Sequence, residues 1–129
     1  MQATQYEFQS HHDKKLVCCE NGYLHNDGRH NGTGDSDSKF IVEPIEFDMC
    51  KIRTKYGYLV VNDEIGQVTC VGKSNAAGAV WKKSYVSDNI IAFQGINGRW
   101  LSAVPEGIVL CWGKKIDVWE HLTIIETYV

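Results

Sequence analysis

The chain has 129 residues, 43% of them hydrophobic, and a formal net charge of −3 at pH 7. A chain of this length and apolar content is expected to fold as one domain, over residues 1–129, around one sizeable core. The acidic balance argues against a general nucleic-acid-binding protein, and no apolar run approaches the roughly 20 residues that a membrane-spanning helix needs.

The N-terminal residues and the cysteines together predict a cellular compartment. The chain begins Met-Gln-Ala-Thr-Gln-Tyr-Glu, without the basic and apolar stretches of a secretion signal, and it contains five cysteines, an odd number. Free thiols in a reducing compartment explain this pattern better than a disulfide framework. We therefore expect a cytoplasmic protein.

Short runs of alternating apolar residues follow one another along the chain, separated by turns rich in Gly, Asn and Asp. Such runs are typical of short strands joined by tight turns. They lie at residues 6–10, 50–54, 58–61, 67–71, 90–93 and 122–125. Residues 28–38 carry turn formers without an apolar anchor, so we expect a mobile loop there.

These runs belong to a pattern that occurs three times. A leucine is followed at similar distances by a glycine, an aliphatic residue and an aromatic residue, and the three leucines are 43 and 42 residues apart. The sets are Leu16, Gly22, Leu24 and Phe40; Leu59, Gly66, Val68 and Trp81; and Leu101, Gly107, Val109 and Trp119. The period predicts three units, at about residues 3–44, 45–86 and 87–129, each with four strands.

Twelve short strands that close with threefold pseudo-symmetry form a β-trefoil, an all-β fold. Three units are too few for a propeller, and closure removes the exposed strand edges. In this fold the repeated leucines, aliphatic residues and aromatic residues point into a shared core, and the glycines fit turns that need positive φ. We expect the repeated apolar residues to be core residues and not ligand contacts.

Three segments resemble known β-trefoil families. CKIRTKYGYLVVNDEIGQVTC, and IIAFQGINGRWLSAVPEGIVLCW with IDVWEHLTII, resemble the fascin repeat, while FQSHHDKKLVCCENGYL is similar to the opening of the hisactophilins. The resemblance covers nearly the whole chain and implies a protein that binds, and in fascins bundles, actin filaments. The chain departs from both families, because it has five histidines where hisactophilin loops are saturated with them, and one trefoil where fascins have four.

A cation follows a glycine after the third predicted strand of each unit. The three pairs are Gly28-Arg29, Gly72-Lys73 and Gly113-Lys114, the last followed by Lys115. Threefold geometry predicts that these cations ring one end of the barrel, where they would attract an acidic protein surface, an anionic lipid head group or a sulfated sugar. The alternative is that they are ordinary solvated loop residues.

Trp112 directly follows Cys111, which strand alternation buries, so we expect the indole to face outward at a loop edge. An exposed tryptophan serves as a contact anchor or as a surface on which a sugar stacks. The alternative is that the ring folds over the end of the barrel as a plug.

These features predict a non-enzymatic binding module. The chain has no nucleophile, phosphate-loop or paired-carboxylate signature, and its adjacent His and Cys pairs lack zinc-ligand spacing, so we expect no catalytic site, cofactor or metal. The first interpretation is an actin-binding protein, with filament bundling as a further option, whose partner is an actin filament or another acidic protein surface. The alternative is a lectin with related glycan sites in the three units. Neither involves nucleic acid or a membrane span, although the cations are compatible with peripheral contact to anionic lipid. The predicted contact residues are Arg29, Lys73, Lys114, Lys115 and Trp112.

Overall fold

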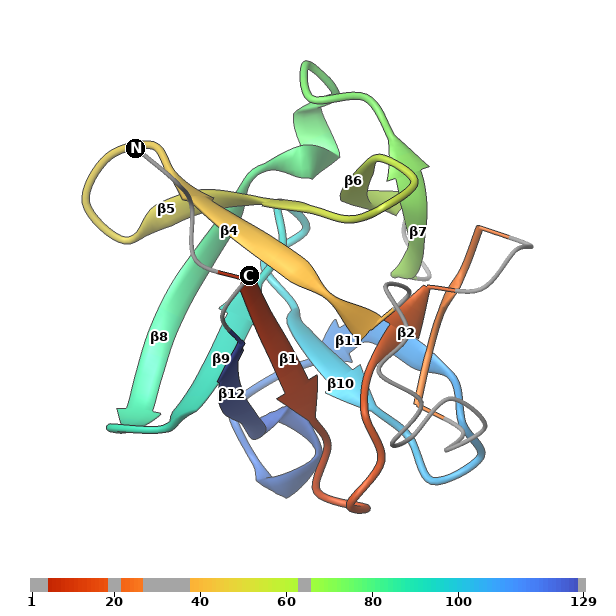
Figure 1. The fold of residues 1–129 in the computed structure, drawn as a ribbon, viewed down its shortest axis with the longest axis vertical. Helices are drawn as coiled ribbons and strands as arrows, with labels where there is room; N and C mark the ends of the chain where they lie inside the picture. The colour runs from red at the N-terminus through yellow and green to blue at the C-terminus, as the bar shows by residue number, and fades with distance from the viewer. Residues whose placement is uncertain (1–4, 19–21, 27–37, 63–65, 128–129) are drawn as a thin grey trace.

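A computed structural model describes residues 5–18, 22–26, 38–62 and 66–127 (Figure 1). Most of the loop predicted at residues 28–38 therefore lies outside the described residues. Within the described part of the chain no helix is long and apolar enough to cross a membrane. The described strands are β1 (Gln5–Gln9), β2 (Val17–Cys18), β3 (Leu24–His25), β4 (Phe40–Pro44), β5 (Met49–Arg53), β6 (Tyr58–Asn62), β7 (Gln67–Gly72), β8 (Trp81–Ser87), β9 (Ile90–Gln94), β10 (Trp100–Ala103), β11 (Val109–Gly113) and β12 (Leu122–Thr127), with 3-10 turns η2 (Ala77–Ala79) and η3 (Val118–Glu120).

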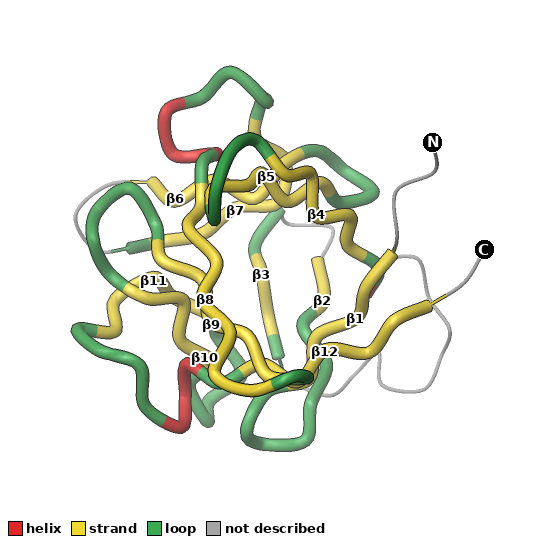
Figure 2. Tube along the Cα trace, turned by 90° about the vertical axis from the view of Figure 1, so that its left-hand side faces the viewer, coloured by secondary structure: helices red, strands yellow, loops and turns green. Residues whose placement is uncertain are grey.

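The first and fourth strands of the three units form a closed barrel. Antiparallel pairing runs β1–β4–β5–β8–β9–β12 and returns from β12 to β1. In Figure 2 these strands surround the β2–β3 hairpin in projection. The closed ring leaves each of its strands with two neighbours, which confirms the predicted twelve-stranded β-trefoil.

The second and third strands of each unit form hairpins that are joined by a threefold set of hydrogen bonds. The backbone amides of Asn26, Cys70 and Cys111 donate to the carbonyl oxygens of the repeated glycines 107, 22 and 66, at 2.7 to 2.8 Å. Gly22, Gly66 and Gly107 have φ angles of +87°, +80° and +101°, as the sequence predicted. A side chain on residue 66 would also overlap the Cys111 carbonyl oxygen.

Eight of the nine predicted core residues are almost fully buried, and the ninth is not. Phe40 and Trp81 are the first residues of β4 and β8, and their side chains fill the barrel interior. The Trp81 indole donates a hydrogen bond to the Leu59 carbonyl oxygen at 2.9 Å. The prediction for Trp119 is wrong, because its side chain is 38% exposed and lies in η3. The third unit places Leu122, which is 1% exposed, at the start of β12 instead.

Two carboxylates, Glu7 and Glu120, are buried, and Glu7 is held by charged partners. Glu7 on β1 is buried, accepts a hydrogen bond from the Ser38 hydroxyl at 2.9 Å, and pairs with Lys15 and Lys39 at 3.2 Å. Burial alone would raise the pKa of Glu7, but these three partners outweigh it and hold the pKa below its ordinary value.

Cys18, Cys50, Cys70 and Cys111 are buried, and none of them forms a disulfide bond with another described residue. Cys19 lies outside the described part. Burial raises the pKa of Cys50 and Cys111 to about 11, because a thiolate loses its hydration in the core.

Candidate functional site

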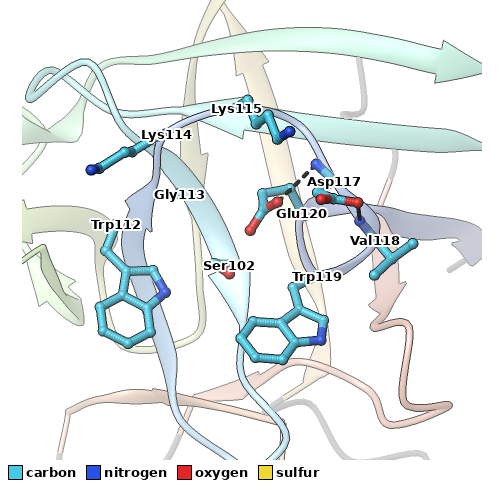
Figure 3. Close-up of a pocket in the computed structure, with 9 residues that line it drawn as sticks. All are labelled: Ser102, Trp112, Gly113, Lys114, Lys115, Asp117, Val118, Trp119 and Glu120. Carbon is cyan, nitrogen blue, oxygen red and sulfur yellow. Dashed lines mark hydrogen bonds between the residues drawn. The ribbon is translucent and has the colours of Figure 1, made fainter.

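A pocket of about 440 Å³ opens in the third unit, between the β10–β11 hairpin and η3 (Figure 3). Its volume lies within the usual range for small-molecule sites. It is lined by Ser102, Trp112, Gly113, Lys114, Lys115, Asp117, Val118, Trp119 and Glu120.

Two exposed indoles form one end of this pocket. Trp112 lies on β11 beside the buried Cys111 and is 48% exposed, so the predicted outward orientation is confirmed. Trp119 comes from η3, and Figure 3 shows the two rings on either side of Ser102. Paired aromatic faces of this kind offer a large apolar contact area at low conformational cost.

A capping box in η3 explains why Trp119 faces the pocket. The Asp117 carboxylate accepts from the Val118 amide, and the Glu120 carboxylate accepts from the Asp117 amide, each at 2.8 Å. These reciprocal bonds close a tight turn, which turns Glu120 inward and leaves the neighbouring tryptophan outside. Gly113 provides the room, because a Cβ there would lie 2.9 Å from Glu120 Oε2.

Ser102 supplies a polar group at the base of the pocket. Its side chain is 1% exposed, yet its hydroxyl has no hydrogen-bond partner among the residues that the structure describes. Buried hydroxyls are nearly always bonded, and leaving one unsatisfied costs about 1–3 kcal/mol. A ligand that enters the pocket and bonds to this hydroxyl would remove that cost.

The corresponding place in the second unit is filled. Val60 follows Leu59 as Ser102 follows Leu101, and its side chain occupies the space that a Cβ on Gly72 would need. Gly78 is the middle residue of η2, three residues before β8 begins, as Trp119 is the middle residue of η3, three residues before β12 begins. The second unit therefore has neither the orphan hydroxyl nor the indole of the third.

A residue of the first unit contacts the site from outside. The ring nitrogen Nε2 of His12 lies 2.9 Å from the Ala103 carbonyl oxygen, and its ring centroid lies 6.2 Å from that of Trp119. His12 does not line the pocket, but it bonds to the end of β10 and packs near the Trp119 ring, a contact that sequence spacing alone does not reveal.

The structure brings together three of the five predicted contact residues. Trp112, Lys114 and Lys115 line the same pocket, and both lysines are exposed. Lys73 is exposed after β7 in the second unit and does not line this pocket. Arg29 lies outside the described residues, so the predicted ring of cations stays a prediction.

Sequence reasoning missed the acidic and hydroxyl groups of the pocket. The spacing of Asp117 and Glu120 is a capping-box signal, and it could have shown that a turn, not a strand, holds Trp119. Ser102 gave no such signal, because nothing in the sequence says that its hydroxyl has no partner.

Comparison with known proteins identifies the fold. No protein-family model and no curated protein sequence matches the chain, so the narrower resemblance to fascins and hisactophilins gains no support at family level. The designed threefold-symmetric protein ThreeFoil matches with a TM-score of 0.80 at 12% identity, over 94% of this chain and 97% of its own.

Two lectin structures also match. SeviL bound to the asialo-GM1 saccharide has a TM-score of 0.74 at 11% identity, over 98% of this chain and 100% of its own. The Polyporus squamosus lectin, bound to the human-type influenza-binding epitope Neu5Aca2-6Galb1-4GlcNAc, has a TM-score of 0.71 at 16% identity, over 96% of this chain and 49% of its own. This chain thus spans about half the length of that lectin, and the likenesses establish the β-trefoil fold.

Proposed function

We propose that the chain is a carbohydrate-binding module whose site is the pocket of the third unit. The observation that carries the proposal is the meeting of two exposed indoles with a buried, unpartnered hydroxyl in one pocket. A sugar ring has an apolar C–H face and a rim of hydroxyls, so it needs both kinds of partner. The lectin complexes among the structural neighbours support the same ligand class.

In this proposal each group has a separate task. The faces of Trp112 and Trp119 pack on the apolar side of the sugar and exclude water from it. The Ser102 hydroxyl exchanges a hydrogen bond with a sugar hydroxyl at the base of the pocket, and Glu120 Oε2 accepts from another. Because the capping box already holds Glu120 in place, little side-chain freedom is lost on binding.

A glycan array of neutral, sialylated and sulfated saccharides tests this function, followed by titration of the best ligand with tryptophan fluorescence as the readout. We expect Trp112→Ala and Trp119→Ala each to weaken binding at least tenfold, as is usual for central aromatic contacts. Phe47→Ala is the matched control, because Phe47 is an exposed aromatic residue outside the pocket. An array without any bound saccharide, or equal affinities for all three variants, would refute the proposal.

The filled second unit also sets the expected stoichiometry. A lectin with equivalent sites in all three units would bind up to three ligands, but Val60 occupies the second position. Calorimetric titration should therefore saturate below three saccharides per chain. Three sites of equal affinity would show that binding does not depend on the features that only the third unit has.

Actin binding, the first interpretation of the sequence, stays a prediction. The structural neighbours named above give it no support, and Lys73 does not join the two lysines at the pocket. Co-sedimentation with filamentous actin at low and moderate salt tests it directly. Absence of pelleting above background at low salt would exclude it.

A further inference from the structure

The lip of the pocket carries two ammonium groups whose charge is not balanced by a partner. Lys114 and Lys115 are exposed and form no ion pair with any residue in the described ranges. Other lysines of the protein are engaged, as Lys15 and Lys39 are by Glu7. The two at the pocket are therefore available to a ligand.

The acidic residues of the same pocket do not cancel this charge equally. The carboxylates of Asp117 and Glu120 each accept a hydrogen bond from a backbone amide and form the wall below Lys115 (Figure 3). Lys114 extends on the other side, above Trp112 and away from both carboxylates in that view. A saccharide stacked on the Trp112 ring would thus meet a positive charge at one edge and hydrogen-bond acceptors at the other.

We infer that the site prefers an acidic saccharide, with Lys114 as the residue that reads its anionic group. This inference rests on the proposed function and adds the ligand class to it. The anionic group is either a carboxylate, as in a sialylated sugar, or a sulfate ester, since both offer oxygens to an ammonium group at similar reach. Lys115 adds to the positive potential at this edge of the pocket, but the carboxylates of Asp117 and Glu120 beneath it weaken its contribution.

The second unit offers a matched control for this inference. Lys73 follows Gly72 as Lys114 follows Gly113, and it is also exposed, but it does not line the pocket. Removing the charge of Lys73 or of Lys114 changes the net charge of the protein by the same amount. Only the loss of Lys114 should affect which sugar is preferred.

The experiment measures the affinities of lactose, sialyllactose and sulfated lactose for the unchanged protein, Lys114→Gln and Lys73→Gln, at low and moderate salt. We expect at least one acidic sugar to bind about fivefold more tightly than lactose at low salt, which corresponds to the upper end for an exposed ion pair. Lys114→Gln should bring the ratio of acidic-sugar affinity to lactose affinity to about one, added salt should lower this ratio in the unchanged protein, and Lys73→Gln should preserve it. The arm that shows the preference identifies the anionic group as carboxylate or sulfate.

Three results would overturn the inference. Equal affinity for lactose and both acidic sugars would remove the acidic preference while leaving the proposed carbohydrate function intact. An equal effect of Lys73→Gln and Lys114→Gln would show that the preference comes from the overall charge of the protein and not from Lys114. No binding of any sugar on a broad array would remove the proposed function itself, and the inference with it.

Discussion

Replacing Ser102 with valine should stabilise the protein and abolish its ligand binding. Valine is the residue that follows the repeated leucine in the other two units, at Val17 and Val60, and both side chains are buried there. In the second unit the valine packs into the space beside Gly72, whose counterpart Gly113 lines the pocket. Ser102→Val therefore places a side chain that the fold already accommodates elsewhere into the base of the site.

The expected gain in stability follows from the orphan hydroxyl. Its removal recovers about 1–3 kcal/mol of desolvation cost, and the added apolar atoms contribute about 0.8 kcal/mol for each buried methylene equivalent. Misfit of the larger side chain would offset part of this gain. A net gain of about 1–3 kcal/mol raises the Tm by roughly 4 °C for each kcal/mol in a chain of this size.

Thermal and chemical denaturation measure the stability, and the sugar titration measures the binding. Ser102→Ala is the companion variant, because it removes the hydroxyl without adding volume. We expect Ser102→Ala to be at least as stable as the unchanged protein and to bind more weakly. If Ser102→Ala were clearly destabilised, the hydroxyl would have a partner in the folded state and the reasoning would fail. Unchanged binding by Ser102→Val would show that the ligand lies elsewhere.

Three further predictions concern the turns and the buried groups. Gly66→Ala places a side chain at φ +80° against the Cys111 carbonyl oxygen, so chemical denaturation should show a loss of about 2 kcal/mol or more; Gly98→Ala, at φ +79° in open space, should cost only about 1 kcal/mol, and equal losses would contradict the argument. Since the pKa of Cys50 and Cys111 is about 11, both should react with iodoacetamide at pH 8 about 100-fold more slowly than an exposed cysteine, as followed by mass spectrometry, and fast labelling of the folded protein would show that they are accessible thiolates. Because the pKa of Glu7 is lowered in the folded state, the unfolded chain binds a proton at this carboxylate first as the pH falls. The Glu7 carboxylate therefore stabilises the fold above about pH 4.5, and this contribution is lost as the pH falls through the native pKa. Glu7→Gln should flatten the acid side of the plot of stability against pH, and an unchanged slope would assign that slope to other groups.

The fold could be predicted because its core positions recur in the sequence. Leucine, aliphatic and aromatic residues at a fixed period identify the interior of a threefold body, and the glycines mark turns that only a residue tolerant of positive φ enters easily. The third aromatic position misled the prediction, because Trp119 has the expected residue type near the expected distance. The capping box between Asp117 and Glu120 makes a turn at that point, and the strand begins at Leu122 instead.

The site could be predicted only in part, because some of its features follow from the local sequence and others depend on contacts between the units. The exposure of Trp112 follows from strand alternation next to a buried cysteine, and the position of Lys114 follows from the repeat. The unsatisfied state of Ser102 depends on which groups other units bring near it, as does the contact between His12 and Trp119. Such facts belong to the tertiary structure and have no local signal.

The third unit can carry a pocket because closure of the trefoil does not depend on the residues that form it. The barrel pairing and the amide bonds to the repeated glycines hold all three units in the same way. In the second unit, Val60 and Gly78 complete the packing around this frame. In the third unit, Ser102 and Trp119 replace them, so this unit loses apolar packing and leaves the Ser102 hydroxyl without a partner among the described residues. Because the frame supplies the stability, the exchange costs one orphan hydroxyl and one exposed indole, and these are the two groups that a sugar ring would cover.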